Sequence, residues 1–209
     1  MNRVKCGKCI DILSTWAYNK IWKKEKGDPV MKKLLSVVLV VMLLLSISAA
    51  ALADTYGLGI STSIGSSKPA ADGKNGTAQV DSTICALVLD EEGKIKSVKF
   101  DVAQTKVAIT EKGEIAADMT AEIKSKTELG DDYGMQKASP LEKGEWFEQA
   151  AAFEAYCLGK TPEEVLGMKT KAKDDHHPSV PDEADVVSNV TMDVGAMLAA
   201  LKKAADSAK

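Results

Sequence analysis

The stretch Thr77 to Thr110, TAQVDSTICALVLDEEGKIKSVKFDVAQTKVAIT, decides the fold of this chain. Its first part, Thr77 to Leu89, ends in a run that is apolar on both faces, which favours a strand at the centre of a sheet. Asp90 to Lys94 supplies a polar turn, and Val98 to Val102 then alternates apolar and polar residues. The pattern predicts a second, half-buried strand antiparallel to the first, which continues through Lys106 to Thr110 before another turn.

A helical period replaces the strand period further along the chain. Trp146, Ala150, Phe153 and Cys157 recur at steps of four, three and four residues. This spacing places them on one side of an amphipathic helix, which we expect to end near Gly159.

The remaining segments are assigned from capping signals and composition. Thr161 to Glu164 reads as a helix start with a hydroxyl N-cap, a proline and a capping-box glutamate. Thr127 to Pro140 reads as a long ordered loop, Lys169 to Glu183 as a polar surface excursion, and Asp185 to Met192 as a strand. Asp193 then caps a last helix. The predicted class is α+β: an antiparallel β-meander sheet packed by an amphipathic helix and a C-terminal helix.

A leader precedes this domain. Met31 to Ala53 combines two lysines, an uncharged apolar run and a small-x-small site at its end, which is the layout of an export signal. We therefore expect translation to start at Met31, with residues 1–30 a mis-annotated upstream extension, and cleavage after Ala53. The alternative is a membrane anchor formed by Leu34 to Ala53, which is long enough to cross a bilayer. Either form places the domain outside the cytoplasm, as a secreted or cell-envelope protein.

The segment that follows the leader, Asp54 to Gly76, is small and polar, and glycines such as Gly57 and Gly59 interrupt any period. It is predicted to be a flexible spacer. Residues 77–209 are predicted to form a single domain.

Charge and cysteine content limit the partners. Residues 54–209 hold 18 basic and 27 acidic residues, a net formal charge of −9, and no arginine follows Arg3. Such a domain repels phosphate backbones, so nucleic acid is excluded as a partner, and a membrane is expected to be contacted only through the signal or an uncleaved anchor. Export would allow Cys85 and Cys157 to pair if folding brings them close.

Two clusters contain residue types that could form reactive sites. Asp174-Asp175-His176-His177 contains both histidines of the chain beside two carboxylates, but adjacent residues point in different directions and no further ligand lies nearby in sequence. Asp131-Asp132-Tyr133 is flanked by glycines, as conformational turns commonly are. Because both histidines share one polar loop, no serine-histidine-acid arrangement is available. We assign no catalytic residue and no metal ligand.

One further candidate site lies just before the predicted last helix, in the segment Asp185-Val186-Val187-Ser188-Asn189-Val190-Thr191. It resembles the end of the bacterial FMN-binding domain, a family of exported electron-transfer proteins and flavin subunits of membrane pumps. The family motif reads Asp, two residues, Ser or Thr, Gly, Ala, then Ser or Thr. Asp185, Ser188 and Thr191 match it.

The resemblance extends over roughly Thr77 to Ala205. It includes the turn Asp90 to Ile95, and the elements Tyr133-Gly134-Met135 and Glu145-Trp146 are similar to a block found in exported clostridial members.

It implies an FMN-binding module that relays electrons, rather than an enzyme acting alone. Thr191, Ser188, Asp185 and Asn189 would be the cofactor-binding residues, with a flavin transferase and envelope redox partners. The family's last hydroxyl can carry FMN through a phosphoester. The sheet and the Trp146 helix would then form an apolar wall for the flavin ring, and the last helix would offer its positive end to the phosphate.

The chain departs from the family at Asn189 and Val190, where the motif has glycine and alanine. Small residues allow a tight turn and access to the hydroxyl, so these departures favour an alternative: a cofactor-free envelope scaffold or interaction protein with the same fold.

Overall fold

The structure, a computed structural model, describes residues 53–138 and 143–209. Within the described part of the chain, Ala53–Lys209 forms one compact unit. The predicted upstream extension and export signal therefore lie outside the described residues, apart from Ala53. Among the helices of the described ranges, none combines the length and the apolar character needed to cross a membrane.

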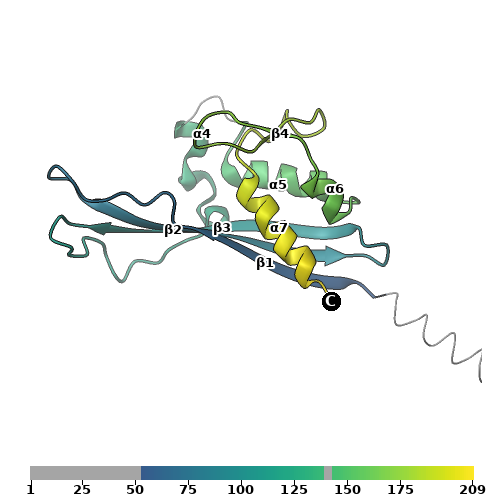
Figure 1. The fold of residues 1–209 in the computed structure, drawn as a ribbon, viewed down its shortest axis with the longest axis horizontal. Helices are drawn as coiled ribbons and strands as arrows, with labels where there is room; N and C mark the ends of the chain where they lie inside the picture. The colour runs from purple at the N-terminus through teal and green to yellow at the C-terminus, as the bar shows by residue number, and fades with distance from the viewer. Residues whose placement is uncertain (1–52, 139–142) are drawn as a thin grey trace, which may run out of the picture. The chain divides into compact units, whose positions relative to one another are not determined.

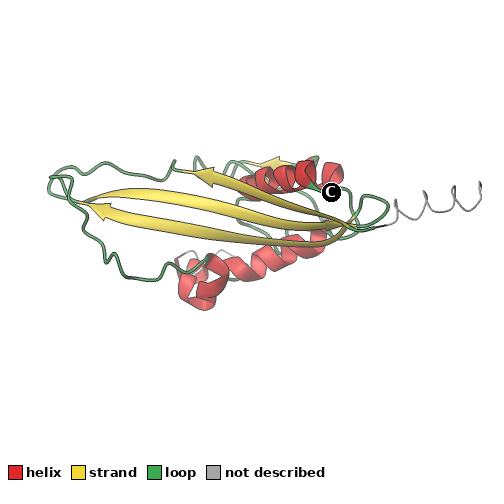
Figure 2. Cartoon of the chain, turned by 90° about the horizontal axis from the view of Figure 1, so that it is seen from below, coloured by secondary structure: helices red, strands yellow, loops and turns green. Residues whose placement is uncertain are grey.

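A three-stranded antiparallel sheet in the order β1-β2-β3 forms the centre of the described unit. The strands are β1 (Thr55–Ser63), β2 (Gly76–Leu89) and β3 (Ile95–Ile109). The predicted pair of antiparallel strands is confirmed, with Cys85 opposite Phe100. The prediction that the first of them is central is also confirmed, because β2 pairs with both neighbours. Figures 1 and 2 show the helices gathered on one face of this sheet.

The prediction of a flexible spacer over Asp54 to Gly76 is wrong for its first half. Thr55–Ser63 is strand β1, and it pairs with β2 along its whole length, from Thr55 opposite Leu89 to Ser63 opposite Asp81. The sheet thus begins two residues after the predicted cleavage site. Gly57 and Gly59 have a packing role here, because β1 passes directly under the last helix, α7 (Gly195–Ser207).

Two longer helices and several short turns cover one face of the sheet. The predicted amphipathic helix is confirmed as α5 (Trp146–Cys157), and the predicted capping box at Thr161 is confirmed at the start of α6 (Pro162–Leu166). The expected loop after Thr127 contains three single turns of helix. The short elements are α3 (Lys126–Leu129), η1 (Gly130–Tyr133), α4 (Met135–Ala138), β4 (Thr170–Lys171) and β5 (Val180–Pro181).

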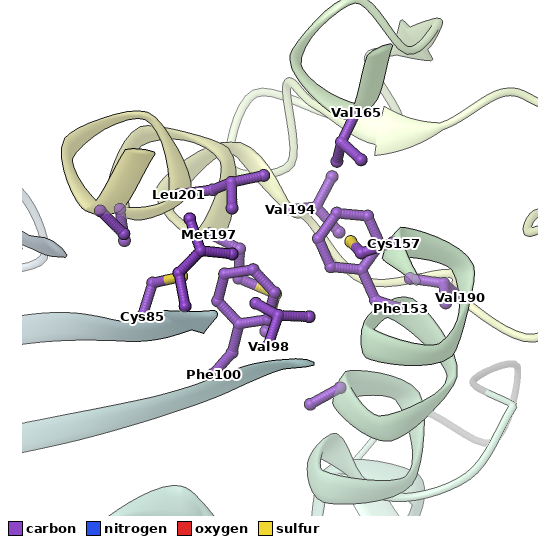
Figure 3. Packing of buried hydrophobic residues seen from close by; sticks show 14 of the residues in the cluster. Cys85, Val98, Phe100, Phe153, Cys157, Val165, Val190, Val194, Met197 and Leu201 are labelled. Atoms are coloured by element: carbon purple, nitrogen blue, oxygen red, sulfur yellow. The ribbon is translucent and has the colours of Figure 1, made fainter. Parts of the chain in front are cut away.

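The core lies between the sheet and the helices α5, α6 and α7. Phe100 of β3 packs against Phe153 of α5, with ring centroids 5.6 Å apart. Figure 3 shows the side chains of β2, β3, α5 and α7 converging, with Val190 beside Phe153 and Cys157. The chain is thus an α+β domain whose helices pack on one side of a small antiparallel sheet.

The predicted strand over Asp185 to Met192 is wrong. The segment forms consecutive turns, in which Val187 N donates to the Glu183 carbonyl and Val190 N to the Val186 carbonyl. Val186 and Val190 are both buried and lie four residues apart. That spacing is helical, and it fills the core from one side of a turn rather than from a strand.

Candidate functional site

A groove lies between the β4–β5 hairpin and the turns that precede Thr191. It has a volume of about 300 Å³. Two lysines and a threonine line it together with aliphatic residues, and most of the lining surface is apolar. This size is at the lower end of small-molecule sites. The lining residues are Lys171, Lys173, Val180, Pro181, Val187, Val190 and Thr191.

Thr191 is held in place by one side chain of α5. The Oε1 atom of Gln149 accepts hydrogen bonds from Thr191 N at 2.8 Å and Met192 N at 3.1 Å, and Thr191 Oγ1 donates to the same oxygen at 3.3 Å. Gln149 Nε2 donates in turn to the Gly144 carbonyl. Gln149 is completely buried, so these bonds form out of contact with water and fix the backbone at the groove.

Lys171 and Lys173 were not identified as site residues from the sequence. Both come from the segment that was predicted to be a surface excursion. Lys169, Lys171 and Lys173 are spaced two residues apart. In an extended segment, residues with this spacing have their side chains on the same side. Lys171 Nζ pairs with Asp182 Oδ1 at 2.7 Å, and both side chains are about half exposed. An exposed pair of this kind contributes little stability.

Of the four predicted cofactor-binding residues, only Thr191 lines the groove. Asp185, Ser188 and Asn189 lie on the preceding turns, and all three are exposed. The structure therefore places Thr191 in a groove with Lys171 and Lys173 rather than with its motif partners.

Neither of the two features expected to surround a flavin is part of this groove. The side chain of Trp146 is 4% exposed, in the core, and is absent from the groove lining. The N-terminus of α7 already holds a carboxylate, since Gly195 N donates to Asp193 Oδ1 at 2.8 Å and Ser179 N to Asp193 Oδ2 at 2.7 Å. A second anion at this helix end would meet the negative charge of Asp193.

The side chains of Asp174 and His177 are bonded to each other. Asp174 closes a turn with His177, whose Nδ1 lies 2.7 Å and 2.8 Å from the two carboxylate oxygens. The hydrogen bond from His177, supported by that from His176 N, lowers the pKa of Asp174. Across residues 53–138 and 143–209, no three His, Cys, Asp or Glu side chains are grouped so that they could hold a metal ion.

Cys85 and Cys157 are free thiols buried in the core. Burial raises the pKa of each to about 12, with a smaller contribution from Glu154 for Cys85 and from Cys85 for Cys157. Both thiols therefore stay protonated and unreactive at neutral pH.

The residues of the groove fit an anionic ligand with an apolar part. Lysine side chains can pair with a phosphate, and the valines and proline suit an uncharged ring system. Comparison of the chain with protein-family models, curated proteins and solved structures finds no match.

Proposed function

We propose that this chain is an exported FMN-binding module that relays electrons at the cell envelope. The observation that carries the proposal is the position of Thr191, whose motif resembles that of FMN-binding domains and which shares a groove with Lys171 and Lys173. The phosphate of FMN would lie near these three groups, and its ring near Val180 and Val187. The redox chemistry would belong to the flavin, while the chain binds and orients it.

The two departures from the family motif are compatible with this proposal. Val190 is completely buried, and its branched side chain packs into the core beside Phe153 and Cys157 (Figure 3). Among the described non-glycine residues, only Asp72 has a positive φ. Asn189 therefore has a backbone that any residue can adopt, and the turn does not depend on a glycine at this position.

The lysines also supply local positive charge on an acidic domain. Residues 54–209 carry a net formal charge of −9, so an anionic ligand is repelled by most of the surface. A groove with two ammonium groups is a site where this repulsion is offset.

Thr191→Ala should abolish flavin that remains bound after denaturation. A phosphoester would join Thr191 Oγ1 to the flavin phosphorus, break a phosphoanhydride bond of a flavin dinucleotide and release a nucleoside monophosphate, with the hydroxyl proton passing to water. The measurement is yellow-green fluorescence of the protein band in a denaturing gel, using protein from its native host. Ser188→Ala is the matched control and should keep the fluorescence. The proposal would be refuted if the wild-type protein were colourless and its absorption spectrum did not change on addition of FMN.

Lys171→Gln and Lys173→Gln should each weaken FMN binding about tenfold, because each removes one charge-assisted hydrogen bond. The measurement is a fluorescence titration of flavin-free protein. Riboflavin, which lacks the phosphate, is the matched ligand and should bind both variants as it binds the wild type. Equal affinity of the wild type for FMN and riboflavin would show that the lysines do not bind the phosphate.

The second candidate function is a cofactor-free envelope scaffold. One observation favours it: the groove lining contains no aromatic side chain on which a flavin ring could stack. The absorption spectrum of the native protein separates the two functions, because the scaffold would show no bands in the blue region.

A further inference from the structure

The face of the sheet that points away from the helices, here called the outer face, is uncovered. Figure 2 views the sheet from this side, and no helix of residues 53–138 or 143–209 crosses in front of it. Burial and register assign alternate residues of each strand to this face. Near the helical end of the sheet these are Tyr56, Leu58 and Ile60 of β1, Ile84, Ala86 and Val88 of β2, and Ser97, Lys99 and Asp101 of β3.

Large apolar side chains are exposed on the outer face. Tyr56, Leu58 and Ile60 are 65%, 59% and 46% exposed, although they lie in a regular strand with its neighbours in place. Ala86 is exposed between them and β3. A contiguous apolar surface of this kind on a soluble domain marks an interaction site.

The charged groups of the outer face are already partnered at its β3 edge. Lys99 Nζ pairs with Glu154 of α5. Asp101 Oδ1 accepts from Val102 N at 2.7 Å and from Thr127 N at 3.2 Å. From Ser97 to Ile109, the other residues that alternate onto this face are uncharged.

The edge of β1 is closed to a further strand. Tyr56 exchanges two backbone hydrogen bonds with Lys209, and Ser207 Oγ bonds both N and O of Leu58. Lys203 Nζ donates to the Ile60 carbonyl at 2.7 Å. A partner that covers the apolar residues of β1 therefore packs on the face and does not extend the sheet at this edge.

We propose that the outer face is a homodimer interface, in which the sheets of two copies pack face to face. At about 3.3 Å per residue and 4.8 Å between strands, the three strands over their full lengths of 9, 14 and 15 residues cover roughly 600 Å² per copy. Two copies therefore bury about 1,200 Å², which reaches the range of stable interfaces.

Electrostatics favour a second copy over a lipid surface. Two domains of charge −9 repel each other least where they meet through a face without free charges. The same charge repels an anionic membrane. The inference does not depend on flavin binding.

Leu58→Glu and Ala86→Arg test the interface, because each places a charge on the outer face at an exposed position. Sedimentation of the secreted wild-type protein should show a reversible dimer, and each variant should weaken dimerisation at least tenfold. Leu158→Glu is the matched control: Leu158 is 49% exposed, follows α5 and lies outside the sheet. This variant should dimerise as the wild type does, and circular dichroism should show that all three variants are folded.

Three results would overturn the proposal. The first is a wild type that stays monomeric up to about 100 μM, well above the micromolar dissociation constants that weak specific interfaces reach. The second is dimerisation of both outer-face variants equal to that of the Leu158→Glu control. The third is flotation of a monomeric wild type with zwitterionic lipid vesicles, which would assign the face to a membrane.

Discussion

Gly59→Ala should destabilise the domain by about 3 kcal/mol, as a forced overpacking of α7 on the sheet. A β-carbon on Gly59 would overlap the carbonyl oxygen of Ala200, well inside the 3.0 Å that real contacts keep. The obstacle is the backbone of α7, which cannot rotate away as a side chain could. Gly57 stands in the same relation to Ala204. Gly57 and Gly59 are two residues apart on the strand, and Ala204 and Ala200 are four residues apart on the helix. Both separations correspond to about 6 to 7 Å, so the same glycine-to-helix contact occurs twice along β1 and α7.

The opposing effect of this substitution is smaller. Replacing glycine with alanine restricts the unfolded chain, which stabilises a protein by about 0.4–1 kcal/mol where the folded site accepts the β-carbon. The steric overlap at Gly59 is larger than this gain, so the net effect on the free energy of unfolding is a loss. Urea unfolding followed by circular dichroism measures the difference. Gly65→Ala is the matched control, because its β-carbon would meet only Ser63 Oγ at 3.4 Å. Equal stability of the two variants would show that β1 does not lie under α7 as described.

The same glycines explain why β1 could not be predicted from the sequence. Gly57 and Gly59 interrupt the apolar alternation of Tyr56, Leu58 and Ile60, and such glycines usually mark mobile segments. Their actual role is close packing against a helix about 140 residues away, which no local pattern records. β2, β3 and α5 could be predicted because each carries a local pattern: an apolar run in β2, apolar and polar alternation in β3, and a helical period in α5.

The candidate site was predictable only in part for a similar reason. Thr191 was identified from a motif, and the structure places it in a groove. Gln149 stands 42 residues earlier on the buried side of α5, so its contact with Thr191 has no local signal. A lone amide among Trp146, Ala150 and Phe153 is the feature that could have identified it, because a buried polar side chain requires partners.

Gln149→Leu should cost about 3 kcal/mol of stability and loosen the backbone at the groove. The substitution removes the acceptor of Thr191 N and Met192 N, and a buried N–H without a partner costs about 1–3 kcal/mol. Leucine is close in volume to glutamine, so lost hydrogen bonds rather than a cavity produce the effect. Urea unfolding measures the cost, and hydrogen exchange should show faster exchange of these two amides.

Gln136→Leu provides the matched control for this prediction, because it makes the same chemical change at an exposed position where only the backbone N–H is bonded, to Glu145. Its stability should change by less than about 0.5 kcal/mol. If Gln149→Leu cost no more than this control, the amide would not be the element that fixes Thr191. Because Thr191 is also the proposed flavin acceptor, Gln149→Leu should in addition lower the fraction of native protein that carries flavin, whereas Gln136→Leu should leave this fraction unchanged. A loss of stability without a change in flavin content would separate the structural role of Gln149 from a role in positioning the hydroxyl.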